Sequence, residues 1–206
     1  MIETNRQYRM SFSTGGLFLK ESLLVIASFC RLNSWNEVRE QVLKDNLLQA
    51  RTAATLKRNT QEIILRLKHL SDGVILQMPG LMPEIQRKII WFAVCETYDF
   101  IREFAVEVIR QKHLTMQYHV DNSDFNEFFN TKQVWHPELE TISPQTLAKL
   151  RQVLFKIVRE AEIINDNGLI IPFAGLSHTP AELAGNRRFL EVLPVSNADF
   201  KRFVSK

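Results

Sequence analysis

The stretch from residue 84 to residue 113 constrains the fold most. Its apolar side chains recur every three or four residues, which is the spacing of one face of an α-helix. So many bulky residues predict one long helix or two short helices, mostly buried at the centre of the protein. The 206 residues include only 7 glycines and 7 prolines, so helices are expected to dominate elsewhere too. The apolar positions are Ile85, Ile89, Phe92, Ala93, Ile101, Phe104 and Val108.

Further helices are predicted from the same spacing and from capping signals. Apolar spacing predicts helices over about 16–32, 51–70 and 122–131, the last with three phenylalanines expected in the core. A Ser or Thr followed three residues later by an acid, or directly by Pro, is typical of a helix N-terminus. Such signals predict helices that begin after Ser34, Ser143, Thr179 and Ser196.

Two short apolar segments near the C-terminus end in proline. They are "LIIP" at 169–172 and "FLEVLP" at 189–194, and they predict a small β-hairpin. Such a hairpin after a long helix resembles the wing of a winged-helix protein. Arg187 and Arg188 would lie at its tip or start, where they could reach a phosphate or the minor groove. The alternative is a loop with exposed charges.

The segment "SDGVILQMPGLMPE" at 71–84 interrupts the helical pattern with two glycines and two prolines. It predicts a boundary between two packed helical subdomains. The predicted fold is therefore mainly α, with a polar arm at 1–9, an N-terminal DNA-binding subdomain at 10–75 and a C-terminal subdomain at 84–206. The N-terminal subdomain would resemble a helix-turn-helix, and the C-terminal one would carry the hairpin.

A Ser-Thr-Gly-Gly cluster at 13–16 precedes the first helix. A Walker-type phosphate loop needs spaced glycines followed by Lys and Ser or Thr, but here Gly15 and Gly16 are adjacent and Glu21 follows Lys20. A hydroxyl at Ser13 or Thr14 acting as the N-cap explains the cluster more simply. A nest of backbone amides that contacts a DNA phosphate remains the alternative.

The charge of the chain is mildly basic and unevenly distributed. Net charge is +3, with 11 Lys and Arg against 7 Asp and Glu in residues 1–80, and 15 against 16 in residues 81–206. The excess therefore lies in the N-terminal part, and it permits binding to nucleic acid. Cys30 and Cys95 are isolated in apolar surroundings and indicate a reducing, cytoplasmic location. No apolar run approaches the length of a membrane span.

The predicted helix at 51–70 holds five basic residues and one acid. At about 100° per residue, Leu56, Ile63 and Leu67 fall on one face. A ridge of Arg51, Thr55, Arg58 and Arg66 falls on the other, with Glu62 and His69. Lys57 and Lys68 flank the apolar stripe, and Thr52 lies beside Arg51.

Arginine binds phosphate or a guanine edge with two donors, and threonine contacts backbone or base. The ridge and the preceding helix have the order of a helix-turn-helix, although the connection "DNLLQA" is longer than the usual turn. The alternative is a solvated face held by ion pairs among Arg58, Glu62 and Arg66. The predicted DNA-binding residues are Arg51, Thr52, Thr55, Lys57, Arg58, Arg66, Lys68, Arg187 and Arg188.

Catalytic and metal-binding patterns are missing from the sequence. The five histidines do not pair at i, i+4, no Cys–His cluster exists and no G-x-S-x-G elbow appears. Asp121, Asp124 and Glu127 are expected to be solvated acids at a helix start. The sequence therefore predicts a protein that is not an enzyme and needs no cofactor or metal.

The segments "MSFSTGGLF", "SWNEVREQVLKDNLLQARTAATLKRNTQEIILRL" and "NDNGLIIP…FLEVLP" resemble the small A-protein family of the BREX phage-defence system, BrxA. The likeness covers residues 10–206, and its motifs are structural rather than catalytic. It implies a small helical protein that works beside a methyltransferase, a phosphatase-like protein and an ATPase. It also implies DNA binding, and a likeness to a helical antitermination factor implies RNA as an alternative ligand.

These observations predict a non-enzymatic protein that binds double-stranded DNA with weak sequence specificity. The alternative is an adaptor whose arginine ridge docks an acidic surface of another defence protein. No membrane association is expected, and the oligomeric state stays open.

Overall fold

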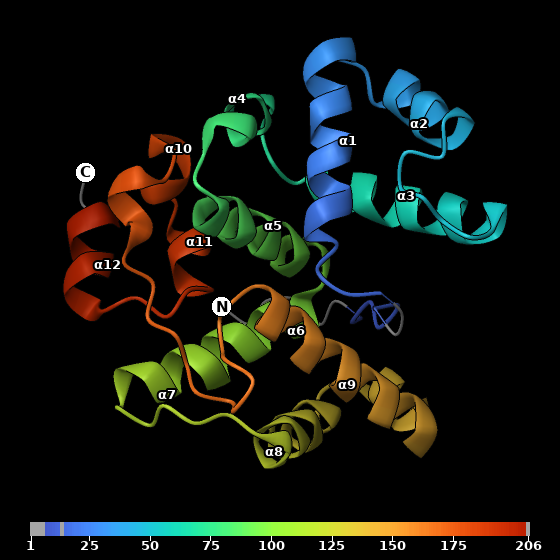
Figure 1. The fold of residues 1–206 in the computed structure, drawn as a ribbon. Coiled ribbons are helices and arrows are strands. Elements are labelled where there is room, and N and C mark those ends of the chain that lie inside the picture. The colour runs from blue at the N-terminus through green and yellow to red at the C-terminus, as the bar shows by residue number, and fades with distance from the viewer. Residues whose placement is uncertain (1–6, 13–14, 205–206) are drawn as a thin grey trace.

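The computed structural model describes residues 7–12 and 15–204, which form a mainly helical fold (Figure 1). The first helices are α1 (Leu19–Leu32), α2 (Trp35–Lys44), α3 (Ala53–Leu67) and α4 (Asp72–Gln77), the last followed by a 3-10 turn, η1 (Met78–Gly80). The central elements are α5 (Pro83–Thr97), α6 (Asp99–Phe104), a π-helical turn η2 (Ala105–Arg110) and α7 (Gln111–Leu114). Next come α8 (Asn122–Gln133), η3 (Pro137–Thr141) and α9 (Pro144–Glu160). The chain continues with η4 (Gly175–His178), α10 (Ala181–Ala184), α11 (Arg187–Glu191) and α12 (Asn197–Val204).

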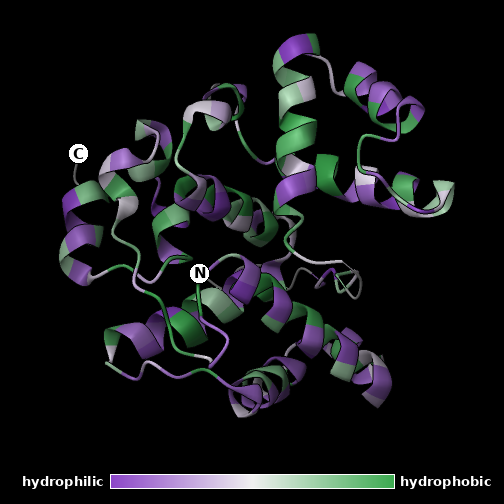
Figure 2. Cartoon of the chain, viewed as in Figure 1, coloured by the Kyte–Doolittle hydropathy of each residue, from purple (hydrophilic) through white to green (hydrophobic). Residues whose placement is uncertain are grey.

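Helix α5 is the buried centre that the spacing of its apolar residues predicts. Nine consecutive or nearly consecutive side chains along it are buried, and α1 and α3 pack against it. Trp91 is fully buried and its indole Nε1 donates to the carbonyl of Val192 at 2.9 Å, which joins α5 to the end of α11. Most other helices alternate polar and apolar colour, as expected of helices with one buried face (Figure 2).

The stretch 84–113 is divided more finely than the sequence predicts. The backbone of Tyr98 is extended, with φ −128° and ψ 94°, and this ends α5 and starts α6. The Tyr98 hydroxyl donates to Glu62 of α3 at 2.5 Å. The break between α5 and α6 therefore coincides with the contact between Tyr98 and α3. Local helix propensity alone does not indicate this break.

Most capping signals mark real helix starts. Ser34, Ser143 and Ser196 accept hydrogen bonds from backbone N–H groups of the first turns of α2, α9 and α12. Helix α10 forms as predicted, but its N-cap residue is Pro180 and no side-chain cap is made. Ser13 and Thr14 lie outside the described residues, and the N-cap position of α1 belongs to Phe18, so the predicted Ser or Thr cap of this helix is wrong.

The predicted β-hairpin and the winged-helix likeness are wrong. Residues 187–191 form helix α11, because Asn186 caps the N–H groups of Arg188 and Phe189. The buried side chains at 189, 190, 192 and 193 follow helical spacing rather than alternation. Residues 169 and 170 make only isolated bridges, to His119 and Ile164. Within the described residues the chain forms no β-strand.

The N-terminal segment is not a free polar arm over its described part. Tyr8 is buried, its N–H donates to Glu138 at 2.8 Å and its hydroxyl donates to Glu103 at 2.5 Å. Burial and the bond to Glu103 raise the pKa of Tyr8 far above its ordinary value. The Tyr8 ring also packs in a T-shaped arrangement with Phe100, which contacts the three phenylalanines of α8 that the sequence predicts in the core.

The predicted boundary at 71–84 contains the short helix α4 and the turn η1 rather than an open linker. Ser71 caps α4 and also donates to Glu182 at 2.8 Å. Helices α1, α2 and α3 pack on one another at one side of the molecule (Figure 1). The division into subdomains at 10–75 and 84–206 stays a prediction.

Candidate nucleic-acid interface

Helix α3 is held in place by its apolar face. Thr52 caps it, accepting from the Thr55 N–H at 3.2 Å and donating to the Thr55 hydroxyl at 2.9 Å. Leu56, Ile63 and Leu67 are buried, as their spacing predicts. The helix therefore turns its remaining face outward with a fixed orientation.

Four of the predicted cations on and around α3 lie exposed. They are Arg51, Lys57, Arg58 and Lys68. In the part of the chain that the structure describes, none of the four side chains makes an ion pair or a hydrogen bond. Because no such bond holds them, an anionic ligand can reach each of the four side chains without breaking an ion pair or hydrogen bond inside the protein.

The exposed face of α3 is rotated from the predicted ridge. Lys57, Arg58 and Gln61 are exposed. Glu62, by contrast, is half-buried, and Arg66 is buried. The connection between α2 and α3 runs over eight residues, with Asn46 holding Ala50 through two hydrogen bonds of 3.0 and 3.1 Å. It is ordered and longer than a typical helix-turn-helix turn, so that likeness stays a prediction.

Arg66 does not lie on an exposed ridge, and its predicted exposure is wrong. Its side chain is 2% exposed, Nε contacts Glu62 at 2.7 Å, and Nη1 donates to the carbonyl of Gly16 at 2.8 Å. The guanidinium also lies over the rings of Phe18 and Tyr98. The segment around Gly16 covers this side of α3, and a projection of one helix cannot show such a cover.

The ion pairs expected among Arg58, Glu62 and Arg66 form only in part. Glu62 pairs with Arg66, and its second basic partner is Arg9 at 3.8 Å rather than Arg58. The Glu62 bond and burial together raise the pKa of Tyr98, burial being the larger cause. Glu62 is thus the centre of a structural network, and Arg58 is left unpaired within the described residues.

Arg187 and Arg188 lie in the first turn of α11, far from a hairpin tip. Arg187 pairs with Glu191 at 2.8 Å and Arg188 pairs with Glu96 at 3.0 Å. Figure 1 shows α11 on the opposite side of α5 from α3. The structure therefore does not bring these two arginines together with the α3 cations, and each already has an acidic partner.

A polar cleft that the sequence did not indicate opens beside Arg58. Its volume is about 390 Å³, and it lies between α3 and the N-terminal segment. Phe18 and Leu65 supply apolar surface, and the polar lining comes from Arg9, Ser11, Arg58, Asn59, Gln61 and Glu62. Arg9 lies 44 residues before the start of α3, so no local sequence pattern joins these groups.

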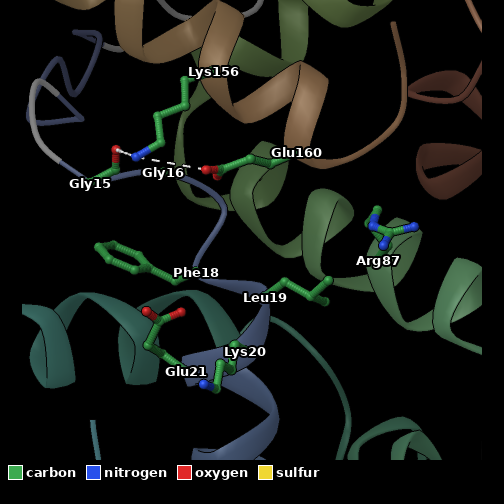
Figure 3. Close-up of a pocket in the computed structure, with 9 residues that line it drawn as sticks. All are labelled: Gly15, Gly16, Phe18, Leu19, Lys20, Glu21, Arg87, Lys156 and Glu160. Carbon is green, nitrogen blue, oxygen red and sulfur yellow. Dashed lines mark hydrogen bonds and ion pairs between the residues drawn. The ribbon is translucent and has the colours of Figure 1, made fainter. Parts of the chain in front are cut away.

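The glycine pair borders a second cleft, of about 360 Å³ (Figure 3). Lys156 donates to the carbonyl of Gly15 at 3.2 Å, and the Leu17 N–H donates to Glu160 at 2.7 Å. A Cβ at Gly16 would collide with the Glu160 carboxylate. The glycines thus allow close approach to α9, and an internal carboxylate already takes the Leu17 amide that a phosphate nest could use.

No catalytic constellation emerges from the described residues. No group of three or more His, Cys, Asp or Glu side chains in 7–12 and 15–204 could hold a metal ion. Asp121 and Asp124 form a reciprocal capping box at the start of α8, as their interpretation as helix-start acids predicts. Hydrogen bonds from Ser123 lower the pKa of Asp121 below its usual value. Over the same residues, no helix is long and apolar enough to cross a bilayer.

Comparisons with known proteins agree on one family. The BrxA family model matches residues 6–174. A "BREX protein BrxA" of Bacillus cereus (strain H3081.97) is 29% identical over 125 residues, which cover 61% of this chain and 62% of that protein. A "BREX protein BrxA" of Escherichia coli O9:H4 (strain HS) is 23% identical over 165 residues, 80% of this chain and 78% of the relative. The chain thus matches less than two thirds of the Bacillus relative's length.

A solved structure shares the fold. The crystal structure of an uncharacterized protein from Magnetospirillum magneticum superposes with a TM-score of 0.76 and 16% sequence identity. The alignment covers 92% of this chain and all of the other. At this identity the likeness concerns the fold alone.

Proposed function

Because the chain belongs to the BrxA family of BREX phage-defence components, we propose that it serves that defence by binding duplex DNA, without catalysing a reaction. The binding surface is the outward face of α3 with the flanking residue Arg51. Lys57 and Arg58 are its centre, and Lys68 extends it. We further propose that residues 10–75 form the DNA-binding subdomain.

The observation that carries this proposal is the unpaired state of these cations. Arg51, Lys57 and Arg58 are exposed and meet no acid within the described residues. Some other basic residues of the described chain are already engaged by acids, as Arg87 is by Glu162 at 2.6 Å. Cations without acidic partners on a rigid helix can bind the phosphate backbone of DNA. Such binding is favourable because it releases the counterions that are condensed on the DNA.

Weak sequence specificity follows from the side chains at the start of α3. The first helical positions hold Ala53 and Ala54, which offer a base edge nothing beyond a contact with a thymine methyl group. The hydroxyls of Thr52 and Thr55 are engaged with each other and with the cap. The cations with free donors on this face are Lys57 and Arg58, and these fit phosphate contacts, which position DNA without reading its sequence.

A salt series tests the proposal directly. Binding of the protein to duplex DNA, single-stranded DNA and RNA of equal length is measured between 50 and 200 mM salt, roughly the range over which phosphate contacts weaken strongly. We expect duplex binding whose log K falls linearly with log salt. Binding that does not depend on salt, or no duplex binding at about 50 mM salt, contradicts the proposal. Tighter binding to RNA than to duplex DNA would show that the ligand is RNA.

One observation favours the adaptor alternative. Val134 and Trp135, just after α8, are 72% and 71% exposed. An exposed tryptophan is typical of the residues that dominate protein–protein interfaces. A Trp135→Ala variant that keeps DNA affinity but loses association with the BREX methyltransferase, phosphatase-like protein or ATPase would assign a docking role to this surface.

The cytoplasm is the compartment we propose for this activity. Cys30 and Cys95 are free, with Cys95 buried and Cys30 half-buried. Free cysteines suit a reducing compartment, where disulfides are rare.

A further inference from the structure

A second row of donors lies on α9, outside the predicted site. Lys149, Gln152, Lys156 and Arg159 are spaced three, four and three residues apart, so they follow one line along the helix. All four are exposed. From Lys149 to Arg159 the helix rises about 15 Å, the axial length of about four nucleotides of one DNA strand.

The row borders a cleft of about 490 Å³. Its lining includes Gly15, Glu160 and the four donors of the row. Lys149 contacts only Gln152 at 3.1 Å among the described residues, and Arg159 lies over the ring of Phe155. Neither cation meets an acid there, which is the same unpaired state found on α3.

The three clefts are neighbours that share lining residues. The cleft on α9 and the cleft of Figure 3 share Gly15, Lys156 and Glu160. The cleft of Figure 3 and the cleft beside Arg58 share Phe18. Figure 1 shows the N-terminal segment running between α3 and α9 on the same side of the molecule. The clefts therefore follow one another from α3, past Phe18, to α9.

Cations outnumber acids in the lining of these clefts, and two of the acids, Glu62 and Glu160, are already engaged, whereas Glu21 makes no ion pair or hydrogen bond within the described residues. Glu62 is bound by Arg66 and Tyr98, and Glu160 is bound by the Leu17 N–H and Lys156. Lys20 adds an exposed cation without an acidic partner within the described residues. An anionic chain along these clefts would meet donors at both ends and few free carboxylates between them.

We propose that DNA bound at α3 continues along these clefts to α9, where its sugar–phosphate backbone contacts Lys149, Lys156 and Arg159. This proposal rests on the proposed function. It makes the interface bipartite: α3 binds one part of the duplex, and α9 binds the backbone beyond it. The Gly15–Leu17 segment fixes the two parts relative to each other, because it is bonded to Arg66 of α3 and to Glu160 of α9.

The test compares two double variants of equal charge change. Lys149→Ala/Arg159→Ala removes two cations of the row and breaks no ion pair. Lys156 is kept, because it also holds Gly15. Lys201→Ala/Arg202→Ala removes two exposed, adjacent cations from α12 and is the matched control. Affinity for duplexes of 10 to about 30 base pairs is measured over a salt series, and thermal unfolding is measured on each variant.

We expect the α9 variant to lower the salt slope on long duplexes by about 1.8 and the affinity by roughly tenfold, with unchanged melting. It should also lose the gain in affinity that the wild type shows as the duplex lengthens. The control should change neither. Equal effects of both variants, or no effect of the α9 variant while wild-type binding is normal, would overturn the bipartite interface and leave α3 as the site. Absence of wild-type binding would overturn the proposed function and this inference together.

Discussion

Arg66 and Gly16, fifty residues apart, are joined by a hydrogen bond of 2.8 Å from the guanidinium Nη1 to the main-chain carbonyl. The same guanidinium neutralises Glu62 from a nearly fully buried position. An arginine on the basic helix α3 is therefore committed to the protein interior. Substitution of Arg66 should therefore change the stability of the protein, whereas substitution of the exposed cations on the same helix should change DNA binding.

Arg66→Ala should destabilise the protein by about 3 kcal/mol, because it leaves the Gly16 carbonyl and Glu62 without their buried partner. Urea unfolding measures the change. Arg58→Ala is the matched control on the same helix and should stay within about 0.5 kcal/mol of wild type. If the Arg66→Ala variant is as stable as the wild type but no longer binds DNA, Arg66 belongs to the DNA-binding surface after all.

Lys57→Ala/Arg58→Ala should weaken duplex binding and leave the fold intact. Two lost phosphate contacts lower the slope of log K against log salt by about 1.8. The measurement is a salt series, with Lys201→Ala/Arg202→Ala as the control of equal charge. If both variants bind alike, the outward face of α3 is not the DNA-binding surface.

Gly16→Ala and Glu160→Ala should be strongly coupled. The added methyl group displaces the Glu160 carboxylate and breaks its bond to the Leu17 N–H, which costs about 1–3 kcal/mol. In a Glu160→Ala background the collision is gone, so the same glycine substitution should cost much less. A double-mutant cycle by urea unfolding measures the coupling, and additive effects would show that this carboxylate does not restrict Gly16.

Because of Lys88, the free energy of unfolding should depend on pH in the alkaline range. Its side chain is buried and donates to the carbonyls of Ala161 and Glu162 at 2.7 and 2.9 Å, and burial lowers its pKa to about 8. Between pH 8 and pH 10 the unfolded chain keeps this proton while the folded chain loses it, so stability rises with pH.

Relative to Lys88→Met, the wild type should therefore gain about 2 kcal/mol over that interval. Comparison with the variant cancels the contributions of Tyr8 and Tyr98, whose raised pKa values act in the opposite direction above pH 10. Urea unfolding at several pH values measures the difference. A difference between the two proteins that is constant with pH would mean that Lys88 stays charged in the fold.

Local signals in the sequence predicted the helices well. A hydroxyl at Ser34 or Ser143 and the spacing of apolar residues along α5 act within one or two turns, so a single stretch of sequence reveals them. The strand prediction for residues 189–194 is wrong because a short apolar run fits a strand or a buried helix equally, and the cap that Asn186 supplies favours the helix.

The candidate site was only partly predictable for a different physical reason. Lys57 and Arg58 lie outside the apolar stripe of α3, which periodicity gives, and both are exposed. Arg66 is buried because a segment fifty residues earlier covers it, and one cleft is lined by residues as distant as Phe18 and Glu160. Such contacts depend on the tertiary arrangement, and a pattern within one helix does not record them.

The bond between Leu17 and Glu160 spans 143 positions of the chain, and it bears on the order of folding. Helices α1, α2 and α3 are neighbours in sequence and can associate early, because the chain between them is short. The Gly15–Leu17 segment can reach its final place only after α9 has formed. During synthesis the start of the chain must therefore wait for residue 160, and removal of the Glu160 carboxylate should speed unfolding while leaving the folding rate nearly unchanged.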